Sequence, residues 1–306
     1  MLFKEITCIG DLYPHMADLP EVVQLVKHSH EASLRNAVGP WSVELKEDGN
    51  YCFMLVADGT AYAFGRSGLR FTNVGFIEAQ FIGYTTGVYL GEIVNDGWEL
   101  ETLSGVISPA RVNPLDASVA VEHMKATEIR LFDFIPLECF IAGLCSDPYK
   151  FRRALLDNYA PLHHKIRVFE YSSLVEAEAA CQELIKQGHE GGCIKALNAD
   201  WKRGRRDWRS MKVVKETSFD LECASVEEGK GKRKGVAANF FFRWKGDKVL
   251  KADLGKGWTD EKRLEAWLNP PIGCVFRVTA MQDSSKGGLL RKAKVQEQRF
   301  DKKADY

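Results

Sequence analysis

Residues 42–65 read SVELKEDGNYCFMLVADGTAYAFG, and their pattern gives the first half of the chain its β-rich character. Val43 and Leu45 alternate with polar residues, which is typical of a half-buried strand. This strand ends at Lys46, where an Asp-Gly pair supplies turn chemistry. The apolar runs on either side of Asp58-Gly59 then predict a β-hairpin. The stretch therefore places a lysine in a tight loop, where it is either a nucleophile or a solvated loop charge.

The composition is that of an ordinary globular protein. Hydrophobic residues make up 45% and charged residues 27% of the 306-residue chain, which is long enough for two domains that each bury a core. No run approaches the ~20 apolar residues that span a bilayer, and the first residues lack a signal-peptide core, so we expect a cytoplasmic protein with no membrane partner. The eight cysteines never form a C-x-x-C pair, which favours reduced thiols over a structural zinc site.

The formal net charge of zero hides an asymmetry along the chain. Residues 202–306 carry 26 basic residues (Lys and Arg) and 15 acidic residues (Asp and Glu). Residues 1–201 carry 16 basic and 27 acidic residues. Basic residues gather at 202–215, 229–235 and 286–303, with tryptophans in and beside the first cluster. Basic clusters with interleaved aromatic residues indicate a surface that follows a phosphate backbone. A solvated face is the alternative for any single cluster.

Periodic apolar segments and capping signals define further elements of the first domain. Strands are expected at residues 88–94, 129–135 and 191–197. Asp147-Pro148 is expected to open a helix over 149–159, as its N-cap and first-turn residue. Ser173 and Glu176 form the capping box of a second helix, which stops at Gly188. These elements predict an α+β domain of antiparallel sheets with flanking helices.

From about Phe219 the chain returns to short strands. Five are expected within about 90 residues, interrupted by a short helix that Thr259 caps. A five-stranded barrel that binds nucleic acid is the OB-fold. The chain is therefore expected to contain two domains, at residues 1–217 and 218–306.

Several short motifs follow one another along the chain. Lys46-Glu47-Asp48-Gly49 matches K-x-D-G, which is weak alone because a chance match in a chain of this length is roughly a one-in-ten event. The later motifs are Arg66 in AFGRSG, Glu92 in YLGEIV, Phe132 in RLFDFIPL, Glu190 in HEGGCIKAL, Lys212 in SMKVV, and RFDK over 299–302. From residue 41 to residue 302 the set resembles the covalent nucleotidyltransferases, and most of all the compact phage- or virus-type ATP-dependent DNA ligases. The resemblance implies an adenylation (nucleotidyltransferase) domain followed by an OB-fold domain.

The resemblance implies an enzyme of DNA replication or repair that seals nicks with 5′-phosphate and 3′-hydroxyl ends in duplex DNA. Lys46 would take AMP from ATP, AMP would pass to the 5′-phosphate, and the 3′-hydroxyl would then expel it. A lysine attacks phosphorus only as a free amine, so we expect nearby cations or burial to lower the pKa of Lys46. The implied cofactors are ATP and Mg²⁺, with Mn²⁺ as a substitute, and the protein would act as a monomer.

The resemblance also assigns nucleoside contacts. Glu44, two residues before the lysine, would accept a hydrogen bond from the adenine amino group. Phe132 would stack on the base, since a purine needs one flat apolar wall. Arg66 and Glu92 would hold the ribose hydroxyls.

Charge neutralisation is implied at the phosphates. Lys195 and Lys212 would hold the α-phosphate while Glu190 orients the metal ion, and Asp48 would act in the later steps at the nick. Arg299 and Lys302 would close over the pyrophosphate as the OB domain moves in. Nucleic-acid contacts are expected at Lys202, Arg203, Arg205, Arg206, Arg209, Lys232, Arg233, Lys234 and Arg291.

Three positions depart from the ligase pattern. Tyr51 stands where many DNA ligases carry an arginine, in K-x-D-G-x-R. Ser210 takes the place of the first lysine of K-x-K, with Arg209 beside it as a substitute, and no proline follows Arg291 where an R-x-P is expected. An RNA ligase or a capping guanylyltransferase of the same superfamily remains an alternative, as does a non-catalytic OB-type nucleic-acid-binding protein. Glu44 and the run WKRGRR favour the DNA ligase.

Overall fold

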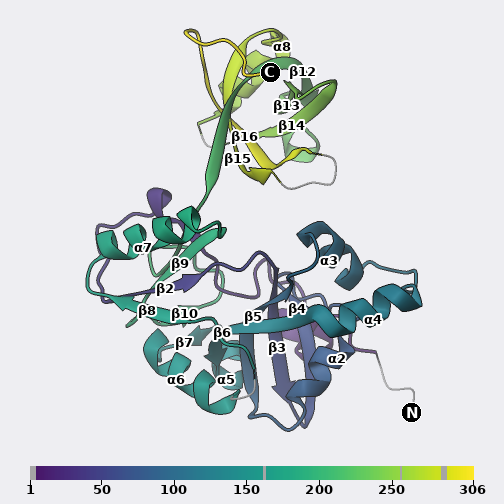
Figure 1. Ribbon diagram of the computed structural model, residues 1–306, viewed down its shortest axis with the longest axis vertical. Helices are drawn as coiled ribbons and strands as arrows, with labels where there is room; N and C mark the ends of the chain where they lie inside the picture. Colours follow the sequence, from purple (N-terminus) through teal and green to yellow (C-terminus); the bar gives the residue numbers. More distant parts are fainter. Residues whose placement is uncertain (1–4, 161–162, 256, 284–287) are drawn as a thin grey trace. The chain divides into compact units, whose positions relative to one another are not determined.

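The computed structural model describes residues 5–160, 163–255, 257–283 and 288–306 (Figure 1). The chain forms two compact units that divide after Val214, three residues before the expected boundary. Lys286, which belongs to the third basic cluster, lies outside the described residues. None of the helices in the described ranges is long and apolar enough to cross a membrane.

Two sheets form the frame of the first unit. One has the strand order β4-β3-β5-β6 and is antiparallel; the other has the order β1-β11-β9-β2-β8, in which β1 pairs in parallel with β11. A short antiparallel pair, β7 with β10, accompanies them. The strands are β1 (Lys27–His28), β2 (Trp41–Leu45), β3 (Asn50–Ala57), β4 (Thr60–Gly65), β5 (Gly87–Asn95), β6 (Thr127–Ile135), β7 (Leu144–Cys145), β8 (Val168–Tyr171), β9 (Gly191–Ala196), β10 (Trp201–Lys202) and β11 (Ser210–Val214).

Helices flank both sheets. Side chains of α7 meet Trp41 and Val43 of β2 in one buried cluster. Successive residues of β3 point to opposite faces of the sheet: Met54 packs in one hydrophobic cluster and Phe53 in another. The four-stranded sheet is therefore buried on both faces. The α-helices are α1 (Ile9–Leu12), α2 (Gly75–Glu78), α3 (Leu100–Ile107), α4 (Ala117–Ala126), α5 (Leu137–Ala142), α6 (Tyr149–Tyr159) and α7 (Leu174–Lys186), with 3-10 turns η1 (Pro14–Met16), η2 (Ser29–Glu31) and η3 (Ala79–Phe81).

The capping predictions are confirmed for α7 and wrong in part for α6. Ser173 Oγ accepts from the amide of Glu176 over 3.2 Å, and the Glu176 carboxylate accepts from the amide of Ser173 over 3.1 Å. The N-cap of α6 is Pro148 and makes no side-chain cap. Asp147 lies one residue outside the helix, where its carbonyl accepts from Arg152 over 2.5 Å.

The second unit is a closed five-stranded barrel with the order β12-β13-β14-β16-β15. Its strands are β12 (Glu216–Glu228), β13 (Ala237–Trp244), β14 (Lys248–Leu254), β15 (Val275–Asp283) and β16 (Leu290–Gln298), with η4 (Gly231–Arg233) and α8 (Asp260–Leu268) between strands. Thr259 Oγ1 caps α8 by accepting from the amide of Lys262 over 3.4 Å. Phe240, Phe242 and Phe276 fill the barrel. The predicted α+β architecture with a C-terminal OB barrel is confirmed.

Candidate active site

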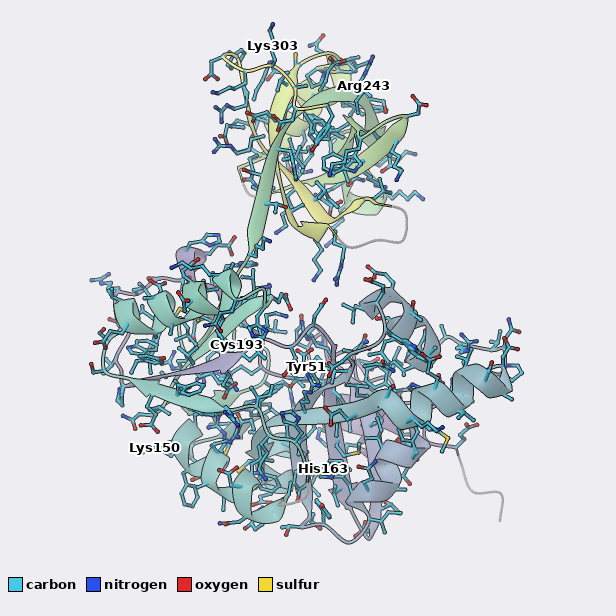
Figure 2. All side chains as sticks on the ribbon, in the orientation of Figure 1. Tyr51, Lys150, His163, Cys193, Arg243 and Lys303 are labelled. Atoms are coloured by element: carbon cyan, nitrogen blue, oxygen red, sulfur yellow. The ribbon has the colours of Figure 1, made fainter. Side chains whose placement is uncertain are left out.

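The first unit brings predicted motif residues from both of its sheets together. Cys193 and Tyr51, one from each sheet, mark the place in Figure 2. In the strand register Cys193 of β9 lies between Glu44 of β2 and Lys212 of β11. Burial raises the pKa of the Cys193 thiol to about 11, although Lys46 and Lys195 act in the opposite direction. This thiol lies within the predicted site and carries no motif signal of its own.

Lys46 follows the last residue of β2, and its contacts fix its position. Its amide donates to the carbonyl of Gly191 over 3.0 Å, and its Nζ lies 2.7 Å from Glu190 Oε2. The loop that follows packs so closely on β5 that a Cβ at Gly49 would lie 2.6 Å from the carbonyl oxygen of Ile93. The glycine of K-x-D-G is therefore required by the packing of the lysine loop.

The surroundings of Lys46 oppose the expected lowering of its pKa. Burial lowers this pKa, but the nearby carboxylates of Glu92 and Glu190 outweigh burial and raise it above its ordinary value. The expectation that cations or burial would lower it is therefore wrong in this arrangement. The site holds its lysine as an ammonium ion bound to a carboxylate.

Glu92 lies on β5, opposite Tyr51 of β3 and Arg130 of β6. Burial raises its pKa from 4.5 to about 7, although the charges of Lys46 and Arg66 act in the opposite direction. The charge of Glu92, and with it the attraction for Lys46, therefore changes near neutral pH.

Glu92→Gln is expected to raise the free energy of unfolding at pH 8 and to have a much smaller effect at pH 5. Because the folded-state pKa is raised, the folded protein binds more protons than the unfolded chain between about pH 4.5 and 7, and its stability falls as pH rises through this range. An amide resembles the neutral carboxyl and removes this loss, which is on the order of 1–3 kcal/mol. Urea unfolding of the wild-type protein and of Glu92→Gln at pH 5 and pH 8 measures this difference in the free energy of unfolding. An equal effect at the two pH values would contradict the raised pKa of Glu92.

Glu44 and Phe132, the predicted base contacts, both lie next to Lys195. Lys195 Nζ is 2.7 Å from Glu44 Oε2 and 4.3 Å from the centre of the Phe132 ring. Glu44 is 2% exposed, and burial raises its pKa against the opposing charge of Lys195. The lysine predicted to hold a phosphate thus lies on the two groups predicted to hold the base.

The departure at Ser210 lies at the start of β11. Ser210 pairs with Lys195 across β11 and β9, while Lys212 lies two residues further on the same face. The guanidinium of Arg209, the expected substitute, lies 2.5 Å from Asp207 of its own loop, so a phosphate contact would require it to leave this carboxylate.

Tyr51 fills the position of the absent arginine with an aromatic ring. The guanidinium carbon of Arg66 lies 4.9 Å from the centre of this ring, and the ring of Phe132 lies 5.9 Å away. Arg66, the predicted ribose contact, therefore rests on the face of a tyrosine. Asp48 and Arg66 are both exposed.

Arg130 is a site residue that the motifs do not reveal. Its guanidinium donates to Glu47 over 2.8 Å, and also to Asp96 over 2.6 Å and Glu128 over 2.8 Å. Glu47 is the variable residue of K-x-D-G, so this ion pair ties the lysine loop to β6. The sequence signal that could have identified Arg130 is its position: it lies two residues before Phe132 and on the same face of the strand.

The transfer of AMP to Lys46 that the resemblance implies is expected to be about tenfold slower in Arg130→Gln, because the lysine loop loses its anchor on β6. Glu47→Gln should have a similar effect. The double variant should lose little more, since both changes break the same ion pair. Labelling rates at saturating ATP measure this coupling, and additive losses would indicate that the two side chains act separately.

The predicted DNA-binding residues divide into enclosed and exposed groups. Arg203 donates to the carbonyl of Phe140 over 2.5 Å, and Arg205 pairs with Asp200 over 2.8 Å. Arg203 thus ties the segment before β11 to α5, and Arg205 closes that segment on itself, so both guanidinium groups have structural partners. The exposed residues are Lys202, Arg206, Lys232, Arg233 and Lys234, while Arg291 is half-buried on β16.

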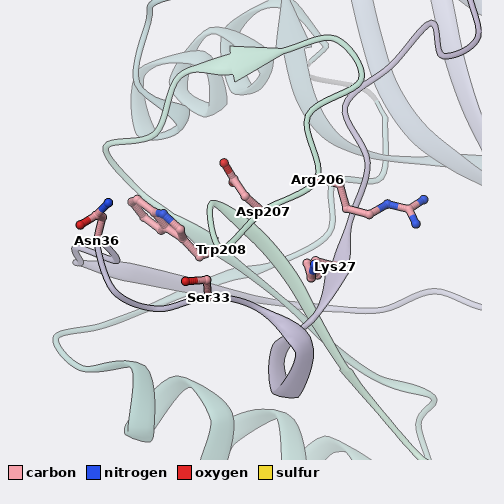
Figure 3. Close-up of a pocket in the computed structure, with 6 residues that line it drawn as sticks. All are labelled: Lys27, Ser33, Asn36, Arg206, Asp207 and Trp208. Carbon is pink, nitrogen blue, oxygen red and sulfur yellow. The ribbon is translucent and has the colours of Figure 1, made fainter. Parts of the chain in front are cut away.

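Arg206 also lines a pocket of about 300 Å³ at the edge of the five-stranded sheet (Figure 3). The other lining residues are Lys27, Ser33, Asn36, Asp207 and Trp208. Trp208 packs edge-on against Trp41, with ring centres 5.8 Å apart. Two cations beside an indole suit the phosphates and bases of a nucleic-acid strand.

In the second unit the RFDK motif follows the last barrel strand. The amide of Arg299 donates to the carbonyl of Val275 over 2.7 Å, and its guanidinium lies 3.5 Å from Asp301. Phe300 is 88% exposed, and Lys302 is also exposed. The pyrophosphate role of Arg299 and Lys302 stays a prediction.

The carboxylates near Lys46 fit a magnesium ion better than a transition metal. Among the described residues no group of three His, Cys, Asp or Glu side chains forms a metal cage. Mg²⁺ does not need one, because one or two carboxylates usually hold it together with substrate phosphates. Glu190, the predicted metal contact, is a carboxylate of this kind and lies 2.7 Å from Lys46 Nζ.

Comparison with known proteins relates this site to a family. Residues 20–213 match the family described as ATP dependent DNA ligase domain. A probable DNA ligase of Anaeromyxobacter sp. (strain K) is 28% identical over 208 residues, which cover 58% of this chain and 40% of that protein, so the chain spans about two fifths of that relative's length. Two solved structures share the fold. Pmar-Lig_Pre. matches with a TM-score of 0.73 and 21% identity, over 96% of this chain and 71% of that one. A Lig E DNA ligase matches with a TM-score of 0.68 and 16% identity, over 90% of this chain and 98% of that one. The chain therefore belongs to the ATP-dependent DNA ligase domain family.

Proposed function

We propose that the protein acts as a monomer that seals nicks in duplex DNA with ATP, through a lysyl-AMP intermediate. The observation that carries the proposal is Lys46, held just after β2 with its Nζ 2.7 Å from Glu190. Glu44 lies two residues before it, and the Lys195 ammonium contacts both the Glu44 carboxylate and the Phe132 ring. A nucleophilic amine, carboxylates and an aromatic wall are what transfer of a nucleotide to a side chain requires. Membership of the ligase family supports the use of ATP.

In the first step the Lys46 nitrogen attacks the α-phosphorus of ATP. A P–N bond forms, the bond to the bridging β-phosphate oxygen breaks, and pyrophosphate leaves. The ammonium must first lose a proton to water. Binding of Glu190 to the metal ion would favour this loss, because Glu190 Oε2 lies 2.7 Å from the ammonium and stabilises its charged form. The 5′-phosphate at the nick then takes AMP from the lysine, and the 3′-hydroxyl attacks that phosphate and releases AMP. Mg²⁺ bound at Glu190 would supply charge neutralisation at the phosphates.

The remaining site residues have proposed roles in these steps. Phe132 stacks on adenine, Glu44 accepts from its amino group, and Glu92 and Arg66 hold the ribose. Lys195 and Lys212 neutralise the α-phosphate, Asp48 acts at the nick, and Arg299 and Lys302 assist the departure of pyrophosphate. Lys195 can take its role only after its ammonium leaves Glu44.

One assay tests the proposal. The protein is incubated with Mg²⁺ and α-labelled ATP or GTP and then denatured, and the label that stays on the chain is measured. ATP labelling followed by sealing of nicked DNA supports the ligase. GTP labelling would indicate a capping enzyme, sealing of nicked RNA alone an RNA ligase, and no labelling a nucleic-acid-binding protein.

Binding to nicked DNA is expected to weaken steeply with salt, by about tenfold or more between 50 and 200 mM, because each neutralised phosphate releases counterions. Replacing the exposed Lys232, Arg233 and Lys234 with alanine should make this dependence shallower. Lys186→Ala, a matched change on an exposed helix of the first unit, should leave the slope unchanged. Titration of a fluorescent nicked duplex at several salt concentrations measures the affinity. An affinity of the wild-type protein that does not change with salt would argue against the basic surface as the DNA-binding site.

A further inference from the structure

Tyr149 is a buried hydroxyl-bearing residue next to the proposed adenine contacts, and no motif includes it. It opens α6 and is 1% exposed. Its hydroxyl donates to Glu44 Oε1 and lies 3.0 Å from the carbonyl oxygen of Phe132. One phenol therefore links the carboxylate proposed to read the base with the strand that carries the stacking ring.

The contacts of Glu44 leave its two oxygens in different situations. Oε1 is taken by Tyr149 from α6, whereas Oε2 is paired with the Lys195 ammonium of β9 over 2.7 Å. Arg153 and Asp133 are the other charged groups that act on Glu44. The tyrosine contact belongs to the buried core, and the lysine contact belongs to a long side chain that can swing away.

A base that stacks on Phe132 needs the space that Lys195 takes. Lys195 Nζ lies 4.3 Å from the Phe132 ring centre and 4.5 Å from that of Tyr149. Entry of the base therefore moves the ammonium away from Oε2, towards the phosphates that it is proposed to neutralise. Tyr149 then remains as the donor that holds the other oxygen.

This arrangement distinguishes the two purines. At the position concerned, adenine carries an amino group that donates, whereas guanine carries a carbonyl oxygen that accepts. A carboxylate oxygen fixed as a bare acceptor attracts the first and repels the second. We propose that Tyr149 is a specificity-determining positioning residue, whose hydroxyl holds Glu44 so that Oε2 accepts from adenine and rejects guanine. The inference rests on the proposed use of ATP at this site.

Tyr149→Phe tests the inference, because it removes the hydroxyl and keeps the ring. Affinities of the full chain for ATP and for GTP are measured by calorimetry, together with labelling at saturating ATP. The preference for ATP over GTP is expected to fall about tenfold, with labelling at saturating ATP changed less than about threefold. Tyr159→Phe, at the far end of the same helix, is the matched control and should keep the preference.

A purely structural hydroxyl would weaken both nucleotides equally or neither, and either result would overturn the inference. Glu44→Gln provides a second route if Tyr149→Phe folds poorly by urea unfolding, since an amide offers a donor as well as an acceptor and should also lose the preference. An unchanged ATP preference in Glu44→Gln would again overturn the inference. Because the affinities are measured without Mg²⁺, so that AMP is not transferred to the protein, a wild-type protein that prefers ATP but takes no label when Mg²⁺ is present would contradict the ligase proposal alone.

Discussion

Lys46→Arg is expected to abolish the label that α-labelled ATP leaves on the denatured protein. Arginine keeps a positive charge beside Glu190, which lies 2.7 Å from Lys46 Nζ, but its guanidinium does not deprotonate in proteins and so offers no free amine. The loss should exceed ~10³-fold, because removal of a nucleophile leaves no alternative covalent path. The change therefore separates the nucleophilic role of Lys46 from its charge.

The matched control uses DNA whose 5′ end at the nick already carries AMP. Sealing this substrate requires only attack by the 3′-hydroxyl, so Lys46→Arg should retain it within about 100-fold while ATP-dependent sealing is lost. Label that persists on Lys46→Arg would point to another nucleophile, with the half-buried Lys212 as the first to examine.

Arg152→Met is expected to lower the free energy of unfolding by about 3–5 kcal/mol, the largest loss of stability that we predict. Arg152 and Asp133 form an ion pair at 2.9 Å whose side chains are only 4% and 6% exposed. Arg152 also donates to the carbonyls of Asp147 and Ala199. Removing the guanidinium leaves the Asp133 carboxylate buried without its cation and leaves these carbonyls without that donor.

Urea unfolding measures this loss, and Lys150→Met on the same helix is the matched control. Lys150 is exposed and lies outside the buried ion pair, so the control should cost about 1 kcal/mol or less. Adding Asp133→Asn to Arg152→Met should recover part of the stability, because it removes the unpaired charge. A double variant no more stable than Arg152→Met would mean that lost packing, rather than charge, dominates.

The sequence predicted the fold where local signals were strong. The hairpin of β3 and β4, the capped helix α7 and the five short strands of the barrel all carry period-2 patterns, turn residues or caps. Helices α3 and α4 were not predicted, and their N-cap residues, Glu99 and Asp116, make no side-chain cap. Helices without such start signals depend on tertiary packing, which a local pattern does not report.

The sequence selected the candidate site residues but did not predict the contacts among them. Ordered motifs selected Lys46 and its neighbours, whereas the contacts that decide their chemistry join residues far apart in sequence. Glu47 and Arg130 are 83 positions apart, and Glu44 and Tyr149 are 105 apart. The direction of the pKa shift at Lys46 likewise depends on carboxylates from other strands and loops. No periodicity or spacing rule encodes such pairings.

The carboxylates that raise the pKa of Lys46 also protect it from unwanted chemistry. An ammonium ion has no lone pair, so acyl donors, aldehydes and other electrophiles of the cell find little to react with while Glu190 and Glu92 face this lysine. The side chain gains its reactivity only when something else draws those carboxylates away. In the proposed enzyme, the pairing that must be broken before attack on phosphorus would also keep Lys46 unreactive towards other electrophiles between turnovers.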